Sequence, residues 1–309
     1  MATVDLEKVC KQVIDKEPVP WLSYIYGGQT DENDKHGTGF TRDIMKAILR
    51  NVGFIGMKDW QSEINDCANL PISLNIEAVK PPKIDFKARK FIQAMMTAPR
   101  LNFTANRYCS LQAFVPLGIE EKVAEGVYYH QNMERLLQGA MEEGFKYGIV
   151  VDYDTIFTRE MVERLIVLME TTPEADAIAP MQVRRDGNEM LLNMTGVETI
   201  DDLDPELMPA KAAHFGLTII RLDALRGMPH PWFQSTPAPD GTWGDHRVDA
   251  DMYFWYRFAD HGKRLFVAPH LAIGHCQLMI TWPNFDLSVR HQYMADWRKT
   301  GLPPDTVRV

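Results

Sequence analysis

Two aspartates one residue apart follow an apolar run in the middle of the chain. Residues 147–151 read YGIVV, and Asp152, Tyr153 and Asp154 come next. The run predicts a short strand buried on both faces. Alternate side chains of an extended segment point the same way, so both carboxylates could reach one ion. The pattern therefore indicates either a solvated turn or a site for a hard cation such as Mg²⁺ or Mn²⁺, which prefers oxygen ligands.

A second candidate site lies in the segment MTAPRLN, at the end of a strand predicted over residues 91–98. It contains Thr97, Pro99 and Arg100. The planar guanidinium group of arginine binds phosphate or nucleobase oxygens through paired hydrogen bonds. Taken alone, the segment is more typical of a surface arginine on a turn.

Acidic and histidine side chains later in the chain form a third group of candidates. Asp249 and Asp251 precede the aromatic-rich residues 252–258. A helix dipole stabilises carboxylates at a helix N-terminus, which is a structural explanation; a general base near an acceptor hydroxyl is the functional one. His270 and His275 follow a strand-like segment, and either is a candidate metal ligand or a structural histidine.

The elements that carry these residues are predicted to alternate between strands and helices from about residue 89 onward. Strands are predicted over residues 91–98, 111–119, 147–152 and 176–183, and helices over 131–143 and 158–170. Such alternation favours an α/β fold with a mostly parallel central sheet flanked by helices. In such sheets ligands gather at the carboxyl ends of the strands, where Asp152 and Asp154 fall, so the metal interpretation gains weight.

The rest of the chain has a different texture. Residues 1–88 are predicted to form a mainly helical N-terminal extension of unknown role, with a polar loop at 27–39, a helix that Thr41 caps and Gly53 ends, and a connector at 80–90. Residues 89–309 are predicted to form the catalytic domain with a helical C-terminal tail.

Composition limits the class of protein. The chain has 309 residues, a net charge of −9 and 45% hydrophobic residues, and its four cysteines show no metal-knuckle spacing. The acidic balance argues against broad affinity for polyanions. No apolar run approaches the length of a membrane span, and a cytoplasmic location is expected, in a host cytoplasm if the gene is phage-encoded.

In this order the segments resemble glycosyltransferases of the GT-A fold, especially family-2-like enzymes, over roughly residues 89–277. Thr97, Pro99 and Arg100 match the T-x-P-R-like segment near the nucleotide. Asp152 and Asp154 match the D-x-D element.

Later segments match with one departure. Gly216 matches the glycine that leads the acceptor-side strand, and His275 falls best on the family's late histidine, a metal ligand in many members. The family's Glu-Asp pair is Ala250-Asp251 here, so the base is left open between Asp251, which is preferred, and Asp249.

The resemblance implies a rossmann-like GT-A fold and a metal-dependent, hexosyltransferase-like enzyme. Its donor would be a nucleotide-diphosphate sugar, with a UDP-sugar favoured, bound with Mn²⁺ or Mg²⁺. Asp154 and His275 would bind the ion, and Asp152 would contact the ribose or the metal through water. Tyr153 and Gly216 would line the nucleotide site.

The acceptor is left open by the resemblance. The chain is similar to stand-alone phage enzymes that glycosylate hydroxymethylated DNA bases. A basic stretch at 80–90 and the pair Arg184-Arg185 would then follow a DNA backbone, although a solvated surface is the favoured explanation. Trp232 and Trp243 are candidates for stacking on a sugar or base, and Trp232 with Phe233 for an acceptor lid. Alternatives are a glycan acceptor, a catalytically silent nucleotide-sugar binding protein, or a nucleotidyltransferase.

Overall fold

The computed structural model describes residues 2–15, 40–63, 72–183, 192–194, 206–244 and 246–306. The chain divides into two compact units, Met1–Lys83 and Ile84–Val309, so the division falls inside the predicted connector. The predicted polar loop at 27–39 and the Arg184-Arg185 pair lie outside the described residues.

The first unit combines helices with an antiparallel sheet. Its elements are β1 (Ala2–Val4), α1 (Leu6–Ile14), α3 (Arg42–Asn51), β2 (Ile55–Asp59) and β3 (Ser73–Val79). The strands lie in the order β1-β3-β2. The prediction of a mainly helical extension did not include this sheet, which accompanies α1 and α3 among the described residues. Leu74 and Ile76 alternate inward along β3 and pack on Met45 of α3, and this period-2 pattern is too short to stand out in the sequence.

Thr41 begins α3 as predicted. Its Oγ1 accepts a hydrogen bond from the Ile44 N–H at 3.3 Å. Gly53 follows the helix with φ of 91°, a left-handed conformation that glycine adopts without strain.

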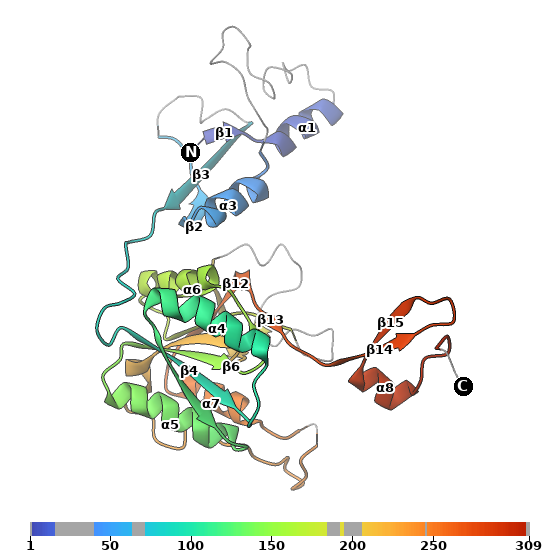
Figure 1. Cartoon of the computed structure of the whole chain (residues 1–309). Coiled ribbons are helices and arrows are strands. Elements are labelled where there is room, and N and C mark those ends of the chain that lie inside the picture. Colours follow the sequence, from blue (N-terminus) through green and yellow to red (C-terminus); the bar gives the residue numbers. More distant parts are fainter. Residues whose placement is uncertain are drawn as a thin grey trace. The chain divides into compact units, whose positions relative to one another are not determined.

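The second unit is an α/β fold, as predicted. Its elements up to the end of the central sheet are β4 (Ile92–Ala98), α4 (Thr104–Leu117), β5 (Glu120–Glu125), α5 (Tyr129–Glu142), β6 (Tyr147–Asp152), β7 (Thr155–Ile156), α6 (Arg159–Thr171), β8 (Ala177–Met181), β9 (Leu192–Met194), β10 (Met208–Ala213), β11 (Leu217–Arg221), the 3₁₀ helix η3 (Leu222–Leu225), α7 (Ala250–Asp260), β12 (Leu265–Ala272) and β13 (Gly274–His275). Helices α4 and α6 cover one face of the sheet, and α5 and α7 cover the other (Figure 1).

The central sheet has eight strands in the order β5-β4-β6-β11-β8-β12-β10-β9. Strand β4 is parallel to β5 and β6, and β8 is parallel to β12, whereas β11 and β10 are antiparallel to both of their neighbours. Most strands therefore share one direction, as predicted, although the sheet is mixed. The carboxyl ends of β4, β6, β8 and β12 and the amino end of β11 consequently lie at one edge.

One predicted strand is a helix. Residues 111–119 are apolar enough to suggest a buried strand, but they form the second half of α4 and its cap. The buried residues of α4 recur at helical spacing, at Asn106, Ser110, Ala113, Phe114 and Leu117. Gly118 ends the helix with φ of 69°. The strand that follows, β5, was missed because Ala124 is its one buried side chain.

A large buried cluster holds the α5 and α7 side of the sheet together. It contains Trp232 and Phe233, each 1% exposed, packed with Phe254 and Trp255 of α7. The prediction that Trp232 and Phe233 form an acceptor lid was therefore wrong, because both rings lie in the core. Trp243 is 61% exposed, as the stacking hypothesis requires.

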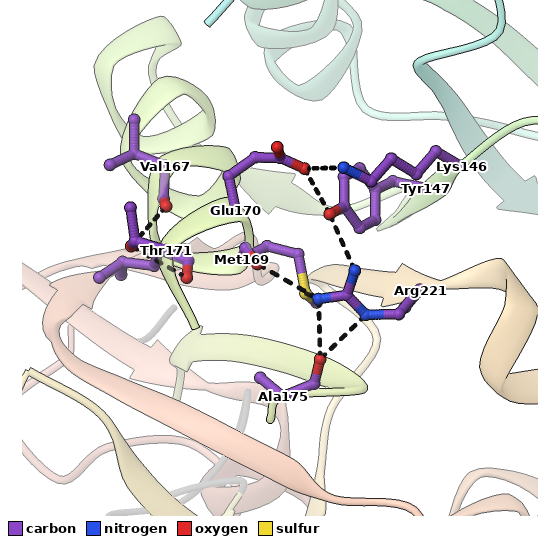
Figure 2. A network of polar contacts seen from close by, with 9 residues as sticks. Lys146, Tyr147, Val167, Met169, Glu170, Thr171, Ala175 and Arg221 are labelled. Atoms are coloured by element: carbon purple, nitrogen blue, oxygen red, sulfur yellow. Dashed lines mark hydrogen bonds and ion pairs between the residues drawn. The ribbon is translucent and has the colours of Figure 1, made fainter. Parts of the chain in front are cut away.

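Arg221 ties the opposite edge of the sheet together (Figure 2). Its guanidinium group donates to the Ala175 carbonyl at 3.3 Å, the Met169 carbonyl at 3.4 Å and the Tyr147 hydroxyl at 3.1 Å. The Tyr147 hydroxyl donates to Glu170 in turn. These bonds close the turn between α6 and β8 over the start of β6.

Replacing Arg221 with methionine is expected to lower the free energy of unfolding by about 1–3 kcal/mol, because buried carbonyls lose their donors. Chemical denaturation measures this change. Arg221→Lys is the matched control for charge and should lose nearly as much, since a lysine cannot reproduce the planar fork. Ligand binding should not change, because Arg221 and the carboxyl ends of the strands lie at opposite edges. A lysine variant as stable as the wild type would contradict the role of the fork.

The chain ends in a hairpin and a short helix where a helical tail was predicted. These elements are β14 (Met279–Pro283), β15 (Val289–Tyr293) and α8 (Met294–Thr300). Among the described residues, no helix has both the length and the apolar character that crossing a membrane requires.

Candidate functional site

The candidate site lies at the edge of the sheet where β4 and β6 end. Thr97 of β4 pairs in register with Asp152 of β6, and its side chain is buried. Pro99 and Arg100 follow β4 and are exposed. The two segments that the sequence singled out are thus neighbours at their carboxyl ends, as parallel pairing dictates.

Helix α4 holds the turn that carries both aspartates. Asn106 is fully buried, and its Nδ2 donates to the carbonyl oxygens of Asp152 at 2.9 Å and Thr155 at 2.7 Å. The ring of Tyr153 stacks on Phe103 at 6.0 Å. Asn106 was missed because its partners are main-chain carbonyls that lie far along the chain, so nothing in the local sequence marks it.

A two-residue strand pair brings His275 to Asp154. Strand β13 pairs with β7, and His275 lies opposite Thr155. The Nε2 of His275 lies 3.4 Å from Oδ2 of the buried Asp154 carboxylate. The Nδ1 of His275 lies 2.9 Å from the Val183 carbonyl oxygen, which only accepts. Nδ1 therefore carries a proton, and Nε2 is the atom directed at Asp154.

The Asp154–His275 pair fits two ligands of one divalent cation. Bonds of about 2.1 Å to atoms 3.4 Å apart subtend an angle of about 110° at the ion, and the angle of about 90° in an octahedral site would bring the two atoms to about 3.0 Å. A backbone carbonyl bonded to the second ring nitrogen is the usual support for a ligating histidine. An ion pair between a protonated His275 and Asp154 is the alternative that the same geometry permits.

The predicted set of three ligands is not assembled. Among the described residues, no group of three His, Cys, Asp or Glu side chains is placed to hold one ion. Asp152 ends β6 and Asp154 lies in the turn that follows, so the two carboxylates do not share the extended geometry that was expected. The pair Asp154 and His275 suits an ion that takes further ligands from substrate oxygens.

A second group of interacting polar side chains consists of Asp152, Tyr129 and Asp251. Burial raises the pKa of the Tyr129 hydroxyl well above 10, and the negative charges of Asp152 and Asp251 raise it further. Tyr129 begins α5, and its ring meets Phe233 edge-on at 6.2 Å. The sequence did not single out Tyr129, because nothing local distinguishes it from the adjacent Tyr128.

The two candidate bases have different environments. Asp249 is exposed and forms an ion pair with Arg247, whose Nε lies 2.8 Å from Oδ1. Asp251 lies in the first turn of α7, and burial raises the pKa of its carboxyl, with a smaller contribution from the charge of Asp249; the N–H of Met252 opposes both effects. Asp251 therefore has the shifted pKa expected of a general base, and Asp249 does not need a catalytic explanation.

Gly216 directly precedes β11 and lies against the end of β6. Its carbonyl oxygen accepts from the Asp152 N–H at 3.4 Å. A Cβ at this position would lie 2.8 Å from Oε1 of Gln182 and 3.0 Å from Nδ1 of His214. A larger residue here would displace the amide of Gln182 or the ring of His214. His270, the competitor of His275, is exposed on β12.

Comparisons with known proteins give weak likenesses. No family model and no curated protein sequence matches the chain. The structure is similar to A197 from STIV, at 14% identity and a TM-score of 0.44, over 65% of this chain and 94% of that one.

Two enzyme structures are similar at lower scores. GalNAc-T7 with UDP, GalNAc and Mn²⁺ has 12% identity and a TM-score of 0.40, over 60% of this chain and 43% of that one. The mannosyltransferase PcManGT from Pyrobaculum calidifontis, in complex with GDP-Man and Mn²⁺, has 10% identity and a TM-score of 0.37, over 60% and 57%. At these TM-scores the likenesses carry no weight for function, which must be argued from the site itself.

Proposed function

We propose that the chain is a metal-dependent glycosyltransferase of the GT-A type that uses a nucleotide-diphosphate sugar, with a UDP-sugar as the first candidate. The observation that carries the proposal is the pairing of buried Asp154 with His275 at 3.4 Å, beside the ends of β4 and β6. The order of the matching sequence segments supports it independently.

The proposed division of roles follows the geometry. Asp154 and His275 would hold Mn²⁺ or Mg²⁺, which neutralises charge on a leaving diphosphate. Thr97, Pro99 and Arg100 would border the nucleotide on the side of β4, where the exposed guanidinium is available to a phosphate or base.

Asp251 would accept the proton of the acceptor hydroxyl. Its carboxyl shares surroundings with Tyr129 and Asp152, so the acceptor side and the donor side of the site are neighbours. A raised pKa makes Asp251 a better proton acceptor than an exposed aspartate once it is ionised. Experiment must identify the sugar and the acceptor. Hydroxymethylated DNA and a glycan are the candidate acceptors.

The test is a panel of UDP-, GDP- and TDP-sugars with Mn²⁺, read by release of the nucleoside diphosphate, with and without hydroxymethylated DNA. Release that depends on one sugar nucleotide and on Mn²⁺ is expected. Release that also requires the modified DNA would identify the acceptor, whereas release stimulated by a glycan would exclude DNA. Binding of a sugar nucleotide without turnover would favour a catalytically silent binding protein. Binding of no nucleotide would refute the proposal.

A further inference from the structure

A buried histidine, His214, lies next to the main chain of the candidate site and forms no hydrogen bond to the carboxylates proposed to act there. His214 follows β10 and is 6% exposed. Its Nε2 lies 2.8 Å from the Pro180 carbonyl oxygen, and its Nδ1 accepts from the Gly216 N–H at 2.9 Å. Since a carbonyl only accepts and an amide only donates, both bonds form in one state, the neutral imidazole with its proton on Nε2.

That tautomer is stable over the whole range in which enzymes normally work. Burial lowers the pKa of His214 to about 4, the bond to Pro180 opposes this shift, and the neighbouring His275 adds to it. His214 is therefore a fixed acceptor for Gly216 and does not exchange protons during a reaction near neutral pH.

The contacts of His214 lead to one side of the site. Gly216 is held at its N–H by His214, and its carbonyl oxygen accepts from the Asp152 N–H. The N–H and the C=O of Gly216, which belong to the peptide units on the two sides of its Cα, thus link the imidazole to the residue that ends β6. The hydroxyl of Thr218 donates to the His214 carbonyl at 2.7 Å, which fixes the turn that His214 and Gly216 share.

The other side of the site is reached through Gln182. Its side chain is 3% exposed and packs so closely on Gly216 that no Cβ fits between them. Its Nε2 donates to the Gly274 carbonyl at 3.4 Å, one residue before His275. His214 and Gln182 therefore form one buried polar layer, with Gly216 between them, that touches the main chain beside Asp152 and beside His275.

We infer that His214 is a positioning residue: its bond to Gly216 sets the main chain at Asp152 and, through Gln182, the segment that carries His275. The expected effect on ligand binding rests on the proposed function, because Asp152 and His275 are proposed to contact the nucleotide and the ion. Outer partners of metal ligands typically contribute about 10- to 100-fold to affinity.

Two substitutions separate the bonds of His214. In His214→Asn the side-chain oxygen takes the place of Nδ1, so the bond to Gly216 is kept and that to Pro180 is lost. In His214→Gln the side-chain nitrogen reaches the place of Nε2, so the bond to Pro180 is kept and that to Gly216 is lost. Each variant loses one hydrogen bond to the main chain, and a purely structural role predicts similar losses in both.

The experiment measures binding of UDP in the presence of Mn²⁺ by calorimetry, with the melting temperature as the measure of stability. His214→Gln is expected to bind about tenfold or more weakly, and His214→Asn to bind nearly as the wild type does. Equal weakening in both variants, or none in either, would overturn the positioning role.

A second measurement separates this inference from the proposed function. Hydrogen exchange at the Gly216 and Asp152 amides should be faster in His214→Gln and unchanged in His214→Asn, whether or not a nucleotide binds. If the wild type binds no nucleotide with Mn²⁺, the proposed function fails and the exchange rates decide the positioning role alone. If His214→Gln does not fold, hydrogen exchange of the wild type decides. The opening free energies of the Gly216 and Asp152 amides should then be equal, and different values would overturn the inference.

Discussion

Asp251→Asn is expected to lower kcat by about 10²- to 10⁴-fold, because the variant has no carboxylate to accept the proton of the acceptor hydroxyl. Binding of UDP with Mn²⁺ should not change, since Asp251 lies on α7, whereas the proposed ligands lie in the turn before β7 and on β13. Steady-state kinetics and calorimetry measure the two quantities. Asp260→Asn is the matched control, because Asp260 is the exposed last residue of the same helix. A variant that keeps its kcat would remove Asp251 from the mechanism.

The pH dependence gives this assignment a second test. Because burial, and then the charge of Asp249, raise the pKa of Asp251, activity should fall on the acid side at a pH above that of an ordinary aspartate. Asp249→Asn removes one of the charges that raise this pKa, so the acid limb of kcat should move to lower pH. A limb that moves upward, or that persists in Asp251→Asn, would show that another group titrates.

Asp251→Asn should raise the stability of the protein while it lowers the activity. The raised pKa means that folded protein binds the Asp251 proton more tightly than the unfolded chain does. The carboxyl therefore costs stability as the pH rises from its unfolded pKa to its folded pKa, and the cost is complete above the folded value. Asp251→Asn is consequently expected to raise the melting temperature near neutral pH, a common property of catalytic groups in buried sites.

Asp154→Asn is expected to abolish stabilisation by Mn²⁺ and UDP. For the wild type at ligand concentrations of about 100 times Kd, binding adds about 2.7 kcal/mol to the free energy of unfolding. The variant keeps the shape of the side chain but lacks the charge that a divalent cation requires, so most of this gain should disappear. Thermal denaturation with and without both ligands measures it.

Matched variants separate loss of the ion from loss of the fold. His275→Gln should lose the same stabilisation, because its Nε2 is the second proposed ligand. Asp223→Asn should retain it, since Asp223 is exposed in η3, after the end of β11 that lies away from the site. Equal stabilisation of the Asp154→Asn and wild-type proteins would contradict metal binding at this pair and leave the ion pair with His275 as its explanation.

The local sequence was sufficient for elements with strong patterns. The apolar runs of β4 and β6 and the capped helix α3 form where they were predicted, because a continuous buried strand and an N-cap are local features. It was insufficient for α4 and β5. An apolar segment of nine residues is compatible with a buried strand or a helix, and only packing on the sheet distinguishes them.

For the site, the sequence by itself determined which acidic side chains follow a strand or begin a helix, and hence Asp152, Asp154 and Asp251 as candidates. Tertiary structure decided the surroundings of each carboxylate, and hence the role for which each is a candidate. It buried Asp154 beside His275, placed Asp152 near Tyr129, and separated half-buried Asp251 from exposed Asp249. It also revealed Asn106 and His214. Their partners are carbonyl and amide groups brought close by strand pairing and helix packing, and every residue type carries those groups, so no sequence pattern marks them.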